Sequence, residues 1–128
     1  MNRVKFMIKR VAVVGCRHYE NYCEAKEYID FCICEIRRKY RLIFVSGGCR
    51  GADSLGERYA AENGFETEIY PAVWGKYGRA AGPKQNKKIA EISDYIICFW
   101  DGKSRGTKSL LRFAAEAEKP VKIKYIKL

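Results

Sequence analysis

Three short segments of the chain combine glycine with arginine in a way that suits the binding of phosphate. They are residues 15–19 (Gly-Cys-Arg-His-Tyr), 46–53 (Ser-Gly-Gly-Cys-Arg-Gly-Ala-Asp) and 100–107 (Trp-Asp-Gly-Lys-Ser-Arg-Gly-Thr). Glycine lets the main chain come close to a ligand, and arginine binds a phosphate through two parallel hydrogen bonds. One such segment is usually a plain turn, but three that meet in space would form an anion site.

Each segment follows an apolar run with the length and composition of a buried strand. The sequence predicts five strands, at 11–14, 42–45, 67–70, 95–100 and 121–126. Helical spacing and capping residues predict helices at 21–39, 53–63, 83–92 and 107–118.

This alternation predicts an α/β fold: three layers, with an open, mainly parallel five-stranded sheet and helices on both faces. We expect one domain over residues 1–128, with a core from about residue 10 to residue 126. Such sheets bind ligands beyond the carboxyl ends of the strands, where the strand order reverses. Helix N-termini at that edge favour phosphate.

The expected site follows from this placement. The backbone of residues 46–51 and Arg50 should hold one phosphate, and the start of the last helix should hold the same phosphate or a second one. Gly15 should allow a ligand to approach, and Arg17 and Arg79 should close over the anion. The predicted contacts from the three segments are Gly15, Arg17, Ser46, Gly47, Gly48, Arg50, Gly51, Asp53, Asp101, Ser104, Gly106 and Thr107. Asp53 and Asp101 are expected to be helix caps first and ligand contacts second.

Residues 72–82 are predicted to be a long loop that acts as a lid over this site. Tyr77 is expected either to stack on a base or to pack the loop onto the sheet, whereas packing is expected for Trp74. Arg79 is expected to reach a phosphate. Asn86, in the first turn of the following helix, is expected to face the ligand.

The amino-acid composition indicates which kinds of partner and which cellular location to expect for this protein. The net charge of +10 favours an anionic partner, either a nucleotide or a nucleic acid, without deciding between them. No apolar run is long enough to cross a membrane, and Met1–Arg10 lacks the apolar region of a signal peptide. The six cysteines form no C-x-x-C pair and His18 is the single histidine. We therefore expect no metal, reduced thiols and a cytoplasmic location, and we assign no cofactor.

The segments GCR (15–17), SGGCRGAD (46–53), YGRAAGP (77–83) and DGKSRGT (101–107) resemble the SLOG superfamily, and in particular its small branch related to YspA and YpsA. The resemblance covers about residues 10–125. It implies a Rossmann-like fold, binding of nucleotides or nucleotide-derived signals, and a bacterial or phage origin.

Two relatives implied by the same resemblance leave alternatives open. Phosphoribohydrolases once called lysine decarboxylases carry a catalytic Glu where this chain has Leu110. Hydrolysis would therefore need another carboxylate, such as Asp53, Asp101 or Glu20, and no catalytic residue is assigned. DNA-processing protein A has a similar glycine-rich turn and binds single-stranded DNA, which the basic charge would suit.

Three hypotheses follow. The first is a sensor or carrier that binds a nucleotide-like phosphate ligand without turning it over. The second is a phosphoribohydrolase-type enzyme, and the third is a protein that binds single-stranded nucleic acid. The aromatic and cysteine side chains of the first helix exceed what one buried stripe needs, so a homo-oligomer, dimer or tetramer, is expected. They are Tyr22, Tyr28, Phe31 and Cys34.

Overall fold

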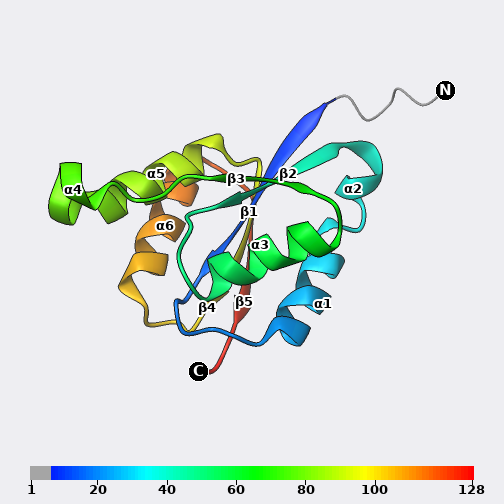
Figure 1. The fold of residues 1–128 in the computed structure, drawn as a ribbon, viewed down its shortest axis with the longest axis horizontal. Coiled ribbons are helices and arrows are strands. Elements are labelled where there is room, and N and C mark those ends of the chain that lie inside the picture. The colour runs from blue at the N-terminus through cyan, green and yellow to red at the C-terminus, as the bar shows by residue number, and fades with distance from the viewer. Residues whose placement is uncertain (1–6) are drawn as a thin grey trace.

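Five strands form one sheet in the order β3-β2-β1-β4-β5, and every neighbouring pair is parallel (Figure 1). The structure is a computed structural model that describes residues 7–128, so most of the Met1–Arg10 signal-peptide prediction lies outside the described residues. The strands are β1 (Ile8–Gly15), β2 (Arg41–Ser46), β3 (Glu66–Ile69), β4 (Tyr95–Trp100) and β5 (Val121–Tyr125). The predicted Rossmann-like sheet of five strands is confirmed, and it is entirely parallel.

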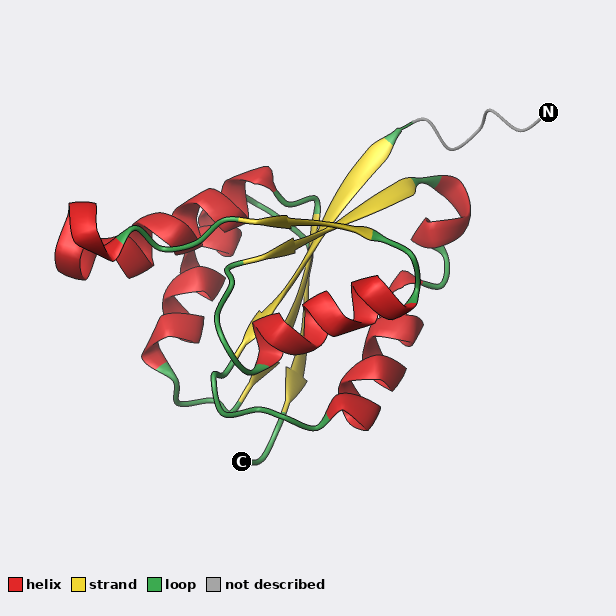
Figure 2. Cartoon of the chain, in the orientation of Figure 1, coloured by secondary structure: helices red, strands yellow, loops and turns green. Residues whose placement is uncertain are grey.

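Helices cover both faces of the sheet (Figure 2). The helical elements are α1 (Tyr22–Ile33), α2 (Ile36–Lys39), α3 (Ala52–Glu62), α4 (Trp74–Tyr77), the 3-10 turn η1 (Gly78–Ala80), α5 (Ala81–Ile92) and α6 (Arg105–Glu116). Within the described residues, no helix is long and apolar enough to cross a membrane.

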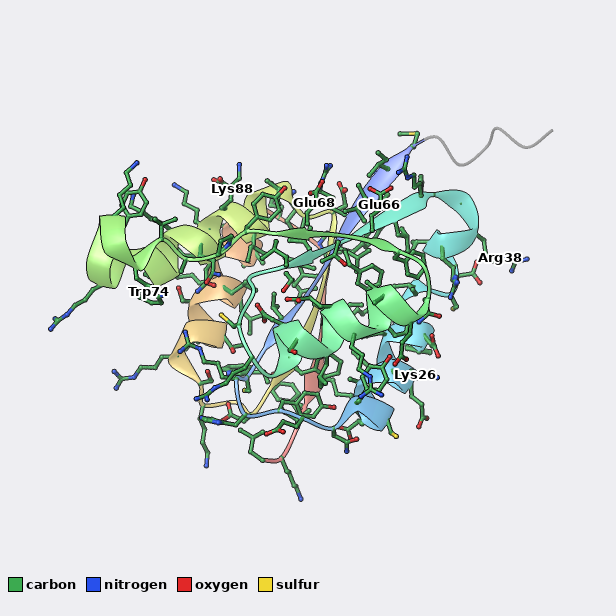
Figure 3. All side chains as sticks on the ribbon, viewed as in Figure 1. Lys26, Arg38, Glu66, Glu68, Trp74 and Lys88 are labelled. Carbon is green, nitrogen blue, oxygen red and sulfur yellow. The ribbon has the colours of Figure 1, made fainter. Side chains whose placement is uncertain are left out.

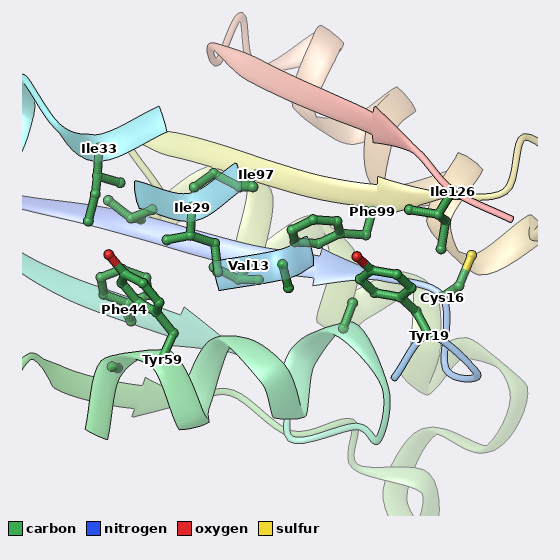
Figure 4. Close-up of a cluster of buried hydrophobic side chains, with 14 of the residues drawn as sticks. Val13, Cys16, Tyr19, Ile29, Ile33, Phe44, Tyr59, Ile97, Phe99 and Ile126 are labelled. Carbon is green, nitrogen blue, oxygen red and sulfur yellow. The ribbon is translucent and has the colours of Figure 1, made fainter. Parts of the chain in front are cut away.

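The two faces of the sheet each carry a hydrophobic core, because successive residues of a strand point to opposite sides. On one face, Val13 of β1 packs with Ile29 of α1 and Tyr59 of α3, all buried (Figure 4). On the other face, the buried side chains of β1 and β4 pack against α5 and α6. The strands β1 and β4 are thus covered on both sides of the sheet.

The first helix is shorter than predicted. It ends at Ile33, and Ile36–Lys39 forms a separate short helix, α2. The thiol of Cys34 donates a hydrogen bond to the carbonyl of Phe31 at 3.3 Å. Such local side-chain bonding competes with the helix ladder, which would use that carbonyl for the N–H of residue 35. The start of the helix is confirmed, since Asn21 Oδ1 accepts from the N–H of Glu24.

The predicted lid loop of residues 72–82 is largely helical. Residues 74–80, which we call the arm, form α4 and η1, and α5 begins at Ala81, two residues before Pro83. The N–H groups of Lys76 and Tyr77 donate to the carbonyl of Val73, and Gly78 ends α4 with a φ of +55°. Figure 1 shows the arm beyond the N-terminal end of α5, directed away from the sheet.

Candidate phosphate-binding cleft

A cleft of about 380 Å³ opens at the carboxyl ends of β1 and β4. These strands are neighbours at the point where the strand order reverses, since β2 and β3 lie to one side and β4 and β5 to the other. Residues from all three predicted segments and from α5 line the cleft. The predicted site residues that line it are Gly15, Arg17, Asp53, Asn86, Asp101, Ser104, Gly106 and Thr107.

A glycine is needed at position 15 because β1 and β4 lie too close together there for a side chain. A Cβ at this position would lie 2.1 Å from the carbonyl oxygen of Phe99, and φ is +146°. The next N–H, of Cys16, donates to the same carbonyl at 3.0 Å. The close approach that we expected of a ligand is therefore made by Phe99, while Gly15 still borders the cleft.

Gly51 has a similar role between two loops. A Cβ there would lie 2.4 Å from the carbonyl oxygens of Cys16 and Arg17. The N–H of Ala52 donates to the Cys16 carbonyl at 3.1 Å. The β1–α1 and β2–α3 loops are thus in direct contact, and this contact places Arg17 at the cleft.

The β2–α3 loop contributes less lining than expected. From this loop and the start of α3, only Cys49 and Asp53 line the cleft, so Gly47, Gly48, Gly51 and Arg50 lie outside its lining. The Ser46 hydroxyl donates to Glu57 of α3 at 2.5 Å and accepts from the N–H of Gly48 at 3.0 Å. The Ser46 side chain therefore faces α3. The Arg50 side chain is exposed.

Asp53 is the buried carboxyl group of the cleft, with 6% of its surface exposed. Its Oδ2 accepts from the N–H of Gly47 at 2.9 Å. Burial raises the pKa of Asp53 to about 7, and the charge of Glu57 adds to the rise, while the N–H groups of Gly47 and Cys49 and the charge of Arg17 oppose it. Asp53 therefore shapes the β2–α3 loop and titrates near neutral pH.

The N-terminus of α6 brings unpaired backbone N–H groups to the cleft. Asp101 Oδ1 accepts from the N–H groups of Lys103 and Ser104 at 2.9 and 2.8 Å, and these bonds lower its pKa. The next three N–H groups, of residues 105–107, have no acceptor within the described part of the chain. Gly106 and Thr107 line the cleft, so unpaired N–H groups and the positive end of the helix dipole lie at its wall.

Two side chains of helix α5 donate hydrogen bonds to main-chain carbonyls of neighbouring segments. Asn86 Nδ2 donates to the carbonyl of Gly106 at 3.1 Å. Gln85 Nε2 donates to the carbonyls of Gly47 and Tyr70 at 2.7 and 3.1 Å. Gln85 was not predicted, because a polar residue in a basic helix gives no signal of where its amide group will find partners.

Tyr77 and Arg79 do not line the cleft. They belong to the arm, where both are exposed. Trp74 is 54% exposed, so the packing that we expected for it covers only part of its ring. Its Cη2 would lie 3.6 Å from a Cβ at Gly82, a residue that lines the cleft. Tyr77 and Arg79 are not among the lining residues, so the lid function stays a prediction.

The cleft itself carries little of the net charge. Among its lining residues, Arg17 is the permanent cation, and Asp53 and Asp101 are the acids. Glu20, the other carboxylate considered for hydrolysis, is exposed and not part of the lining. Leu110 borders the cleft with 3% of its surface exposed, so no carboxylate occupies that place.

Comparison with known proteins gives one match to a protein family and several similar proteins. The model of the YspA, cpYpsA-related SLOG family matches residues 9–77, just over half of the chain. The Gene 61 protein of Mycobacterium phage D29 is 31% identical over 121 residues, which cover 89% of this chain and 94% of that protein.

Two solved structures of DNA processing protein A share the fold. The protein from Streptococcus pneumoniae aligns with a TM-score of 0.68 and 20% identity over 94% of this chain. A structure of the Helicobacter pylori protein, described for its single-stranded DNA binding mode, aligns with a TM-score of 0.63 and 20% identity, again over 94% of this chain. The chain spans 52% and 66% of those proteins, and at this identity the likeness shows the fold alone. The match to the family model and the similarity to the phage protein together show that this chain belongs to the YspA, cpYpsA-related SLOG family.

Proposed function

We propose that the cleft binds a nucleotide or nucleotide-derived ligand through its phosphate group, and that the protein acts as a sensor or carrier of this ligand. The observation that carries the proposal is the α6 N-terminus, where the N–H groups of Gly106 and Thr107 have no acceptor in the described chain and both residues line the cleft together with Arg17. Backbone N–H groups, a helix dipole and an arginine are the groups that bind a phosphate in proteins. The cleft volume of about 380 Å³ falls within the range of small-molecule sites.

Binding without turnover is supported by the residues around the helix. Leu110 stands where the related hydrolases have a catalytic glutamate, and its side chain is buried beside the cleft. Asp101 already accepts two backbone N–H groups. When the protein is incubated with each of the four nucleoside 5′-monophosphates, we expect no free base by chromatography. Release of free base would instead support the phosphoribohydrolase hypothesis and direct attention to Asp53.

The binding proposal can be tested with a pair of matched variants. A Cβ at Gly106 or at Gly75 meets no atom within 4 Å, and neither residue has a positive φ. Gly106→Glu places a carboxylate at the proposed phosphate site, whereas Gly75→Glu adds the same charge on the arm. In calorimetric titrations with the four nucleoside 5′-monophosphates, we expect Gly106→Glu and Arg17→Ala to weaken binding by about tenfold or more. Gly75→Glu should bind as the unaltered protein does.

Two results would count against the proposal. If no nucleoside monophosphate binds at millimolar concentration, the cleft does not serve such ligands. If Gly106→Glu and Gly75→Glu weaken binding equally, the ligand responds to overall charge and not to the α6 N-terminus.

A second candidate function is the binding of single-stranded nucleic acid. The net charge of +10 favours it, and the protein of known structure from Helicobacter pylori that shares this fold binds single-stranded DNA. Because Arg17 is the one permanent cation in the cleft lining, most of the charge that would contact a strand lies elsewhere on the molecule.

A further inference from the structure

A shallow groove of about 260 Å³ lies between the end of β3 and the arm, outside the cleft. We call it the arm groove. Its walls include Ile69 and Val73, which are 51% and 49% exposed, and Tyr77, which is 38% exposed. Every residue from Val73 to Ala80 is exposed. Exposed apolar and aromatic side chains from the end of β3 and from residues 73–77 therefore line the groove, and the described chain does not cover them.

Cations surround the arm groove. Lys84 and Lys88 line it, and Figure 3 shows Lys88 on α5. Lys76 Nζ and Lys84 Nζ lie 5.2 and 4.8 Å from the centre of the Tyr77 ring. The sequence has no carboxylate between Glu68 and Glu91.

Internal ion pairs do not neutralise this charge. The nearest acid along the chain before the groove, Glu68, is paired with Arg10 at 2.8 Å. Among residues 7–128, none of the ion pairs involves a lysine or arginine from positions 76–88. The exposed ring of Tyr77 thus lies in the groove beside lysines that form no ion pair within the described residues.

We propose that the arm groove binds single-stranded nucleic acid, with a base stacked on Tyr77 and phosphates contacted by Lys84 and Lys88. This inference rests on the second candidate function and assigns it to a surface separate from the cleft. Exposed aromatic rings beside lysines are the combination that holds unpaired bases and their phosphates. A duplex keeps its bases stacked on one another, so it would leave the rings unused. An anionic membrane would favour a broad apolar face over a narrow groove.

The test uses fluorescence anisotropy with a labelled thymidine 20-mer and an abasic 20-mer of the same length. Tyr77→Ala should weaken binding of the thymidine strand about tenfold and leave the abasic strand unaffected, because it removes stacking alone. The control Tyr125→Ala removes a ring that is 67% exposed on β5 and should change neither. Lys84→Gln with Lys88→Gln should reduce the slope of log affinity against log salt by about 1.4, and Lys39→Gln with Lys122→Gln should not.

The outcomes separate the inference from the functions on which it rests. If the thymidine strand binds, and Gly106→Glu in the cleft abolishes this binding while the arm variants do not, the arm groove is excluded and the second candidate function stands. If no strand binds, both fail, and the mononucleotide titrations still decide the cleft. Equal affinity for the abasic strand, or binding to vesicles of anionic lipid that depends on Trp74 and Tyr77, would also overturn the inference.

Discussion

The side-chain amide of Gln85 donates a hydrogen bond of 2.7 Å to the main-chain carbonyl of Gly47, and so fastens α5 to the β2–α3 loop. Gln85→Ala should lower the free energy of unfolding by about 1–2 kcal/mol, because it leaves this carbonyl and that of Tyr70 without their donor. Urea denaturation measures the change. Lys87→Ala, at an exposed position of the same helix, is the control, and an equal loss in both variants would show that the Gln85 bonds do not stabilise the fold.

Gly15→Ala should prevent stable folding. The added methyl group would lie 2.1 Å from the carbonyl oxygen of Phe99, at a backbone angle that alanine rarely adopts. We expect a loss of at least about 3 kcal/mol, seen as a large fall in melting temperature or as insoluble protein. Gly106→Ala, where the methyl group meets open space, should melt at or slightly above the temperature of the unaltered protein. A cooperative melt of Gly15→Ala at an unchanged temperature would contradict this account of the β1–β4 contact.

Asp53 should make stability depend on pH. Its folded pKa of about 7 lies above the unfolded value of about 3.9. Its contribution is therefore fully present below pH 4 and is lost as the pH rises through 7. Relative to the unaltered protein, Asp53→Asn should gain about 2–4 kcal/mol between pH 4 and pH 8, because each pKa unit corresponds to about 1.4 kcal/mol. Denaturant titrations of both proteins across this range measure the difference, and a constant difference would mean that Asp53 titrates in its ordinary range.

The cysteines should differ in their reaction with a thiol reagent. Cys23 and Cys34 are exposed and should react within minutes. Cys98 is buried, and burial raises its pKa to about 12, so it should react only after unfolding. Cys49 lines the cleft and is half-buried, and a bound mononucleotide should slow its labelling. Mass spectrometry of partly labelled protein distinguishes the sites. Faster labelling of Cys98 than of Cys23 would show that the core opens readily.

The strands and the position of the cleft were predictable because they depend on local composition and on a general rule. Continuous apolar runs such as 11–14 and 42–45 identify strands that are buried on both faces. The carboxyl ends of parallel strands meet at one edge, so the segments that follow β1 and β4 had to lie together. The start of α1 was predicted from the capping side chain of Asn21, the residue before the helix.

The part of the site that escaped prediction depends on tertiary contacts. A glycine in the sequence does not reveal what comes close to it, and at Gly15 and Gly51 the neighbour is another loop or strand of the same chain. Gly75, Gly78 and Gly82 indicated a loop, yet a short helix forms there and carries Tyr77 away from the cleft. The partners of Gln85 lie on β3 and the β2–α3 loop, distant in sequence, and no local pattern encodes them.

Gln85 borders both the cleft and the arm groove. A single side chain thus forms part of two surfaces that we assign to two different ligands. Thermodynamic linkage then sets a condition on any communication between them. If a nucleotide in the cleft changes the affinity of a strand for the groove by some factor, the strand must change the affinity of the nucleotide by the same factor. Substitution of this one glutamine is accordingly the place to look for a loss of that coupling while both ligands still bind.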